Sequence, residues 1–125
     1  MAKKGNYIQG RIASFGYAFQ GIKTLVRSQA NARIHLLASV LVLGLGLLLN
    51  LSTGEWAILA LAMGGVWAAE ALNTAIEFLT DLVSPDPHPL AGKAKDVAAA
   101  GVLLMAIAAA AAGLLIFIPR IILLF

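Results

Sequence analysis

The sequence predicts an all-α membrane protein, in which an amphipathic surface helix precedes three transmembrane helices. Hydrophobic residues make up 61% of the chain and charged residues only 12%, whereas a soluble domain is roughly 45–50% apolar with about 25% charged residues. Three apolar segments are each close to the ~20 residues that cross a hydrocarbon core. The length of 125 residues allows one domain, covering 1–125.

The segment at about 7–30 predicts the surface helix. Its apolar residues recur at spacings of three and four, which is the period of an amphipathic helix. We expect it to lie on the cytoplasmic face with its aromatic rings at headgroup depth. The alternative is a helix packed on the rest of the protein without lipid contact. The apolar positions are Ile8, Ile12, Phe15, Phe19, Ile22 and Val26, partly opposite Arg11, Lys23 and Arg27.

The three predicted spans cover about 34–51, 56–79 and 97–118. The first contains polar residues only near its ends and on one face, and the third contains no charged residue. The second span has a similar length but carries a stripe of polar residues. Charged groups at bilayer depth are energetically costly, so they indicate a functional site.

The basic residues predict the orientation. Six Lys and Arg precede the first span and Lys93 and Lys95 lie between the second and third, whereas only Arg120 follows the third. The positive-inside rule therefore places the N-terminus and the 81–96 loop in the cytoplasm and the C-terminus on the other side of the membrane. Because the charge is distributed in this way, the net charge of +3 does not indicate a nucleic-acid partner.

The polar stripe contains Glu70, Asn73, Glu77 and Asp81. At ~100° per residue, all four project from one helix face within an arc of about 80°. The stripe begins inside the membrane edge and continues toward the cytoplasm. Acids this close repel one another, so ionised carboxylates need a cation, a basic partner or a shared proton.

The start of the third span offers basic partners. Lys93, Lys95 and Asp96 follow the segment SPDPHPLAG at 84–92, whose prolines predict an extended loop. Asp96 can also be interpreted as the capping residue at the start of a helix.

Composition and spacing leave two chemistries open. The chain has no cysteine, and the sequence lacks the nucleotide-binding and metalloprotease motifs. Carboxylates and an amide on one face suit Mg²⁺, which is bound through one or two carboxylates and substrate phosphates. A base, a metal ligand and a lysine at the cytoplasmic edge fit phosphoryl transfer from ATP to a lipid hydroxyl. A small proton-coupled transporter of the multidrug type fits the residues equally well.

The segment EALNTAIEFLTDLVSPDPHPLAGKAKDVAAAGVLL resembles the signature of the prokaryotic diacylglycerol kinase and undecaprenol kinase family. Its core, E-x-x-N-[ST]-A-[IL]-E-x-x-x-D followed by H-x-L-x-x-x-A-K-D, fixes several polar residues within hydrophobic sequence. The pattern GYAFQG at 16–21 extends the resemblance into the surface helix. A transporter would explain Glu70 but neither the Lys95–Asp96 pair nor this helix.

The resemblance implies a lipid kinase that uses ATP and Mg²⁺ and forms homotrimers with active sites shared between subunits. It implies Glu70 as general base and Asn73 as the residue that orients the hydroxyl or the phosphate. Glu77 would ligate the metal and contact the nucleotide. The remaining implied site residues are Asp81, His88, Lys95 and Asp96 around the nucleotide and Arg11 near the substrates.

One position departs from the family pattern. Family members commonly carry glutamate where this chain has Gln29. An amide oxygen can still ligate metal but adds no negative charge, so we expect weaker metal binding or greater use of the phosphates. A non-catalytic membrane subunit that retains the fold is the remaining alternative.

Overall fold

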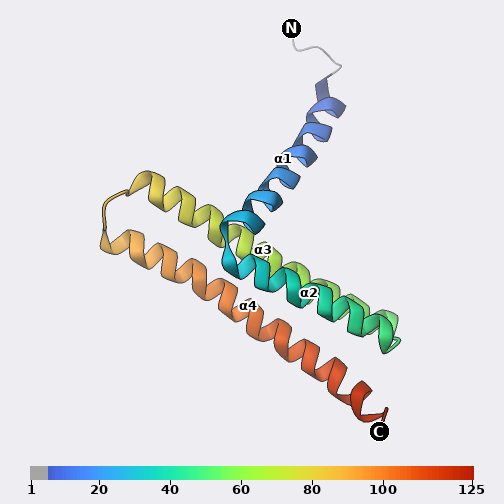
Figure 1. Ribbon diagram of the computed structural model, residues 1–125. Helices are drawn as coiled ribbons and strands as arrows, with labels where there is room; N and C mark the ends of the chain where they lie inside the picture. Colours follow the sequence, from blue (N-terminus) through green and yellow to red (C-terminus); the bar gives the residue numbers. More distant parts are fainter. Residues whose placement is uncertain (1–5) are drawn as a thin grey trace.

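The computed structural model describes residues 6–125, which form four α-helices joined by short connections. The helices are α1 (Asn6–Ser28), α2 (Ala30–Leu48), α3 (Thr53–Val83) and α4 (Pro89–Ile122). α3 and α4 form the most extensive contact, α2 packs against α3, and α1 leaves the other three helices at a steep angle (Figure 1). The site described below is built mainly on α3.

The three apolar segments predicted from the sequence are confirmed as helices long and apolar enough to cross a membrane. Two of these helices extend beyond the predicted spans 56–79 and 97–118. α3 has 31 residues and α4 has 34, which correspond to ~46 and ~51 Å at 1.5 Å per residue. A hydrocarbon core is only ~30 Å thick. The predicted spans end where charged residues lower the hydropathy. The backbone hydrogen bonds of a helix continue through such residues, so both helices are longer than the predicted spans.

Local capping explains where α3 and α4 begin. The Ser52 hydroxyl accepts a hydrogen bond from the Glu55 amide, and the Glu55 carboxylate accepts one from the Ser52 amide, which forms a capping box. At α4, Nδ1 of His88 accepts a hydrogen bond of 3.1 Å from the Leu90 amide, and Pro89 occupies the first helical position. Proline suits this position because its missing amide hydrogen is not needed there.

Two expectations about this region are therefore wrong. The segment 84–92 is not an extended loop throughout, since α4 already begins at Pro89. Asp96 is not a helix cap, because it lies in the second turn of α4 and His88 is the capping residue. The reason is that a proline breaks a helix only in its interior and is tolerated in the first turn.

The other two connections are short. Only Gln29 separates α1 from α2, and its backbone is extended with φ −112° and ψ 121°. Asn50, in the turn between α2 and α3, has a φ of 49°, a left-handed conformation that asparagine adopts more readily than most residues. These two breaks set the directions of α1 and α3 relative to α2.

Arg120 joins the end of α4 to the turn between α2 and α3. Its guanidinium donates to both carboxylate oxygens of Glu55, at 2.6 and 3.3 Å, and to the carbonyl oxygen of Asn50 at 3.3 Å. A two-point contact between arginine and a carboxylate is strong and directional. The contact of Arg120 with Glu55 and Asn50 therefore holds the end of α4 against the end of α2 and the start of α3. The polar stripe lies toward the other end of α3.

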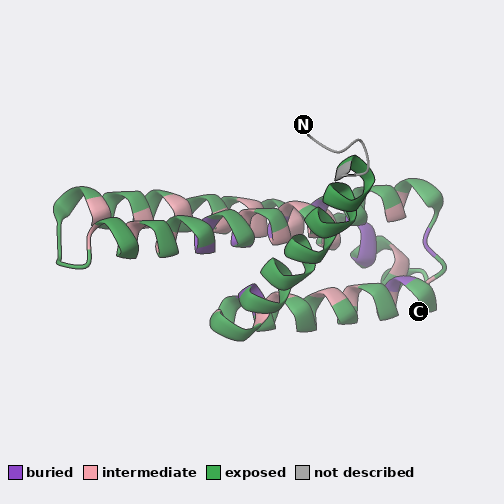
Figure 2. Ribbon diagram, turned by 90° about the horizontal axis from the view of Figure 1, so that it is seen from above, coloured by how far each residue is buried: buried purple, intermediate pink, exposed green. Residues whose placement is uncertain are grey.

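Most of the described residues are exposed, as the green parts of the ribbon in Figure 2 show. The buried hydrophobic cluster is small and consists of Leu51, Leu59, Ile116 and Phe117. On α1, the apolar face predicted from the sequence is not covered by the described chain; for example, Phe15 and Phe19 are each 69% exposed. Apolar area of this extent needs lipid or other protein chains to cover it.

We predict that Gly46 is required for the close approach of α2 to α3. A β-carbon at Gly46 would lie 2.6 Å from Cη2 of Trp56, whereas one at Gly44 would meet no atom within 4 Å. Gly46→Ala should therefore destabilise the protein by about 1–3 kcal/mol, the usual effect of overpacking. Thermal unfolding in detergent micelles measures this, and Gly44→Ala is the matched control. Equal unfolding temperatures for the two variants would contradict the prediction.

Candidate active site

The polar stripe predicted on the second span lies on α3 and runs from the protein interior to the surface. Glu70 is 1% exposed and Asn73 is 8% exposed, Glu77 is half-buried, and Asp81 is exposed. The residues before Glu70 on this face pack against neighbouring helices. The solvent exposure of the stripe therefore increases along α3, and Glu70, at its inner end, has the least exposed carboxylate.

The inner end of the stripe faces α2. Nε2 of His35 lies 3.1 Å from Oε1 of Glu70. The contact does not complete a hydrogen bond, since Oε1 of Glu70 has no hydrogen-bond partner among the described residues. A buried carboxylate without a full set of partners is costly in a stable fold, and an unsatisfied polar group in a native structure suggests a functional role.

In the middle of the stripe, Gln29, Asn73 and Glu77 form one cluster. The Gln29 amide donates to Oε2 of Glu77 at 3.0 Å, and the Asn73 amide donates to Oε1 of Glu77 at 3.4 Å. The cluster therefore brings together Gln29 and Glu77, the two residues for which the resemblance implies metal binding. The extended backbone at Gln29 between α1 and α2 directs its side chain toward α3.

The outer end of the stripe meets α4. Lys95 forms a hydrogen-bonded ion pair with Asp81, and both residues line a pocket of about 310 Å³ together with His88. Because the two side chains are 40% and 63% exposed, this pair adds little to stability. Its charges remain available to a ligand at the surface.

Two predicted site residues do not join the others within one chain. Arg11 donates to the Tyr7 hydroxyl at 2.8 Å and lies over the Tyr7 ring on its own helix, in the part of α1 that points away from the other helices (Figure 1). Asp96 is exposed and forms no ion pair within the described residues.

The donor atoms of the cluster fit a metal that arrives with its own phosphate ligands. Within residues 6–125, no group of three or more His, Cys, Asp or Glu side chains could hold a metal ion alone. Oδ1 of Asn73 is buried and lacks a partner among the described residues, while the amide nitrogen of the same side chain donates to the Glu77 carboxylate. One carboxylate and one amide oxygen match Mg²⁺, which keeps much of its coordination for water and phosphate oxygens.

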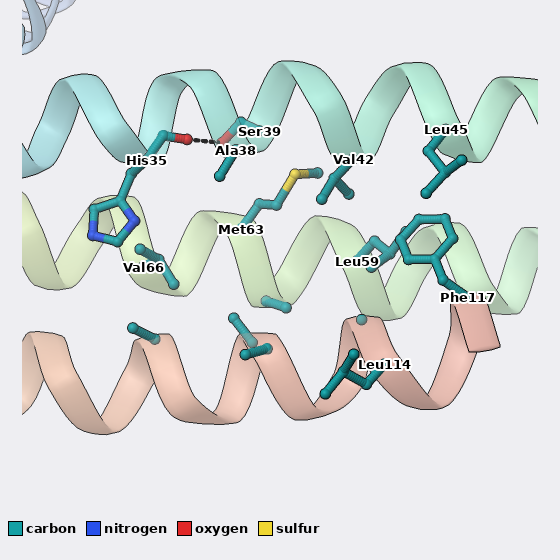
Figure 3. A pocket seen from close by; sticks show the side chains of 15 residues that line it. His35, Ala38, Ser39, Val42, Leu45, Leu59, Met63, Val66, Leu114 and Phe117 are labelled. Carbon is teal, nitrogen blue, oxygen red and sulfur yellow. Dashed lines mark hydrogen bonds between the residues drawn. The ribbon is translucent and has the colours of Figure 1, made fainter.

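His35 is the site residue that the sequence interpretation missed. The available signal was its place at the start of an apolar span, since an ionisable residue at membrane depth indicates function. His35 also forms the polar end of a cleft of about 520 Å³ that runs along α2, α3 and α4 to Phe117 (Figure 3).

The helices and the stripe define an α-helical membrane protein in which one face of α3 carries a buried acid and, further along, an ion pair at the surface. Comparison with known proteins identifies the family. The family model for prokaryotic diacylglycerol kinase matches residues 16–117. The chain therefore belongs to the prokaryotic diacylglycerol kinase family, and it is a multi-pass membrane protein and a lipid kinase.

Individual relatives agree with this assignment. The chain is 44% identical to an undecaprenol kinase of Bacillus subtilis over 86% of this chain and 87% of the relative. It is 42% identical to a diacylglycerol kinase of Synechocystis, over 86% of this chain and 62% of that protein. A diacylglycerol kinase of Escherichia coli is 30% identical over 78% of this chain and 80% of the relative. Of the two chemistries that the residues left open, the family supports phosphoryl transfer.

Proposed function

We propose that the protein transfers the γ-phosphoryl group of ATP to the hydroxyl of a membrane lipid, either undecaprenol or diacylglycerol. The observation that carries this proposal is the polar stripe on one face of α3, which runs from the buried Glu70 through the contact between Asn73 and Glu77 to the Asp81–Lys95 ion pair. Its inner end suits a lipid hydroxyl and its outer end suits a charged nucleotide. The undecaprenol kinase and diacylglycerol kinases among the relatives support the two lipid classes.

Glu70 acts as the general base in this proposal. Its carboxylate takes the proton of the lipid hydroxyl while the hydroxyl oxygen bonds to the γ-phosphorus and the bond to ADP breaks. Burial of Glu70 removes competing water, which strengthens its interactions with the reacting groups. Asn73, one turn further along α3, orients the hydroxyl or the phosphate.

The nucleotide occupies the outer half of the stripe. The ammonium group of Lys95 is suited to phosphate oxygens, and Asp81 and His88 line the same pocket. Glu77, with Asn73 and with Gln29 after rotation of its amide, would hold Mg²⁺. When bound, this ion offsets negative charge on the phosphates. In the present arrangement the Gln29 amide nitrogen faces Glu77, so ligation through the oxygen requires the amide to turn.

We propose that the functional unit is a homotrimer with active sites shared between subunits. Two features support this assembly: the large exposed apolar surface of one chain, and the separation of Arg11 and Asp96 from the rest of the site. In the trimer, a neighbouring subunit would bring Arg11 toward the substrates and Asp96 toward the nucleotide. The distribution of Lys and Arg supports a bacterial inner-membrane location with the site facing the cytoplasm.

The proposal predicts that purified protein in mixed micelles transfers label from [γ-³²P]ATP to undecaprenol or diacylglycerol, and that Glu70→Gln abolishes this transfer. Glutamine keeps the shape of the side chain but cannot accept the proton. Glu55→Gln is the matched control, since it changes the same residue type at the other end of α3, and it should keep the turnover per folded molecule. Near-normal turnover by Glu70→Gln would show that the base is assigned wrongly.

The cluster at Gln29 yields a second prediction. Gln29→Glu places another carboxylate beside Glu77, which is 3.0 Å from the present amide, and should lower the Mg²⁺ concentration for half-maximal activity several-fold. A Mg²⁺ titration of lipid phosphorylation at saturating ATP measures this. Gln29→Asn, which keeps a neutral amide, is the control. An unchanged half-saturation point in Gln29→Glu would contradict a role for this position in metal binding.

A further inference from the structure

We propose that His35 is a positioning residue for Glu70, and that it orients the carboxylate for proton transfer from the lipid. This inference rests on the proposed function, because it assigns Glu70 the role of general base. It adds a residue from α2 that belongs neither to the acidic stripe nor to the nucleotide pocket.

The contact itself is specific. Nε2 of His35 lies 3.1 Å from Oε1 of Glu70, whose side chain is 2% exposed. Within the described residues, no lysine or arginine forms an ion pair with Glu70. Among the described residues, the imidazole is thus the N–H group that lies within reach of this carboxylate from α2. In a structure without substrate, catalytic hydrogen bonds are often long or poorly aligned and tighten when the substrate binds.

A second contact holds α2 and α3 in register beside this pair. Nε1 of Trp67 donates to the Ser39 hydroxyl at 3.1 Å, and that hydroxyl donates to the carbonyl oxygen of His35 at 2.7 Å. Trp67 precedes Glu70 by three residues on α3, and Ser39 follows His35 by four on α2. The two links therefore lie about one helical turn apart. Together they fix the position of the His35 backbone on α2 relative to Glu70 on α3.

The surroundings explain why such a partner is needed. His35 and Ser39 are the polar side chains among the 15 that line the long cleft, and Figure 3 shows the imidazole at one end beside Val66. The remaining lining side chains are apolar and cannot orient a carboxylate. The His35 side chain is 23% exposed, so it reaches Glu70 while one part of the ring remains accessible from the cleft.

The role is tested with two substitutions in the full-length protein in lipid micelles. His35→Gln keeps an N–H donor near the position of Nε2, whereas His35→Leu removes it at similar size. We expect kcat of His35→Leu to fall about tenfold or more, within the usual range for a disturbed general base. The KM for ATP should stay unchanged, and His35→Gln should restore most of the rate. All rates are expressed per folded molecule.

Three outcomes would overturn the inference. A wild-type kcat in His35→Leu would show that the contact does not orient Glu70. Equal loss of kcat in both variants, together with lowered unfolding temperatures, would indicate a role in packing alone. If wild-type protein fails to phosphorylate lipid, the proposed function fails first and this inference with it.

Should His35→Leu not fold, Trp67→Phe replaces it. That variant removes the Nε1 donor to Ser39 together with part of the indole ring. It should lower kcat several-fold with an unchanged KM for ATP, and an unchanged kcat would again contradict the proposal.

Discussion

The structure depends on one constraint, which is the burial of the Glu70 carboxylate among apolar helices. Glu70 is almost completely buried, and such a group persists only where surrounding groups hold it in place and function requires it. α2 covers it with His35, and α3 continues from it toward groups that are progressively more hydrated. The Glu70 end of the polar stripe is shielded from water and suits a lipid alcohol. The Asp81 end is exposed and suits nucleotide phosphates. Both ends belong to a single helix.

The lengths of α3 and α4 make this separation possible. Each helix exceeds the ~30 Å hydrocarbon thickness, so one continuous helix carries both membrane-spanning and surface residues. The contact between Arg120 and Glu55 fixes one end of the helix pair, and the contact between Lys95 and Asp81 joins the other. Rigid helices of this kind position side chains more precisely than loops do.

The sequence was sufficient to predict the helices and the face that carries the acids, because both follow from the fixed geometry of the α-helix. Residues separated by three or four positions must share a face, as Glu70, Asn73 and Glu77 do.

The start of α4 was not predicted, since the prolines near 84–92 were interpreted as breakers and Pro89 instead occupies the first helical position. The partner of Glu70 was also missed. Periodicity within α3 contains no information about which residue of α2 lies opposite, so only the tertiary packing places His35 there. For Arg11, residues 6–125 provide no hydrogen-bond or cation–π partner other than Tyr7 on its own helix.

The most direct measurement is a structure of the protein in a lipid bilayer with a non-hydrolysable ATP analogue and a bound lipid alcohol. The account predicts that the lipid hydroxyl oxygen lies about 2.6–3.2 Å from a carboxylate oxygen of Glu70, with the nucleotide phosphates toward Glu77 and Lys95. A lipid hydroxyl placed against Asp81 or Glu77, with Glu70 in contact only with protein, would contradict it.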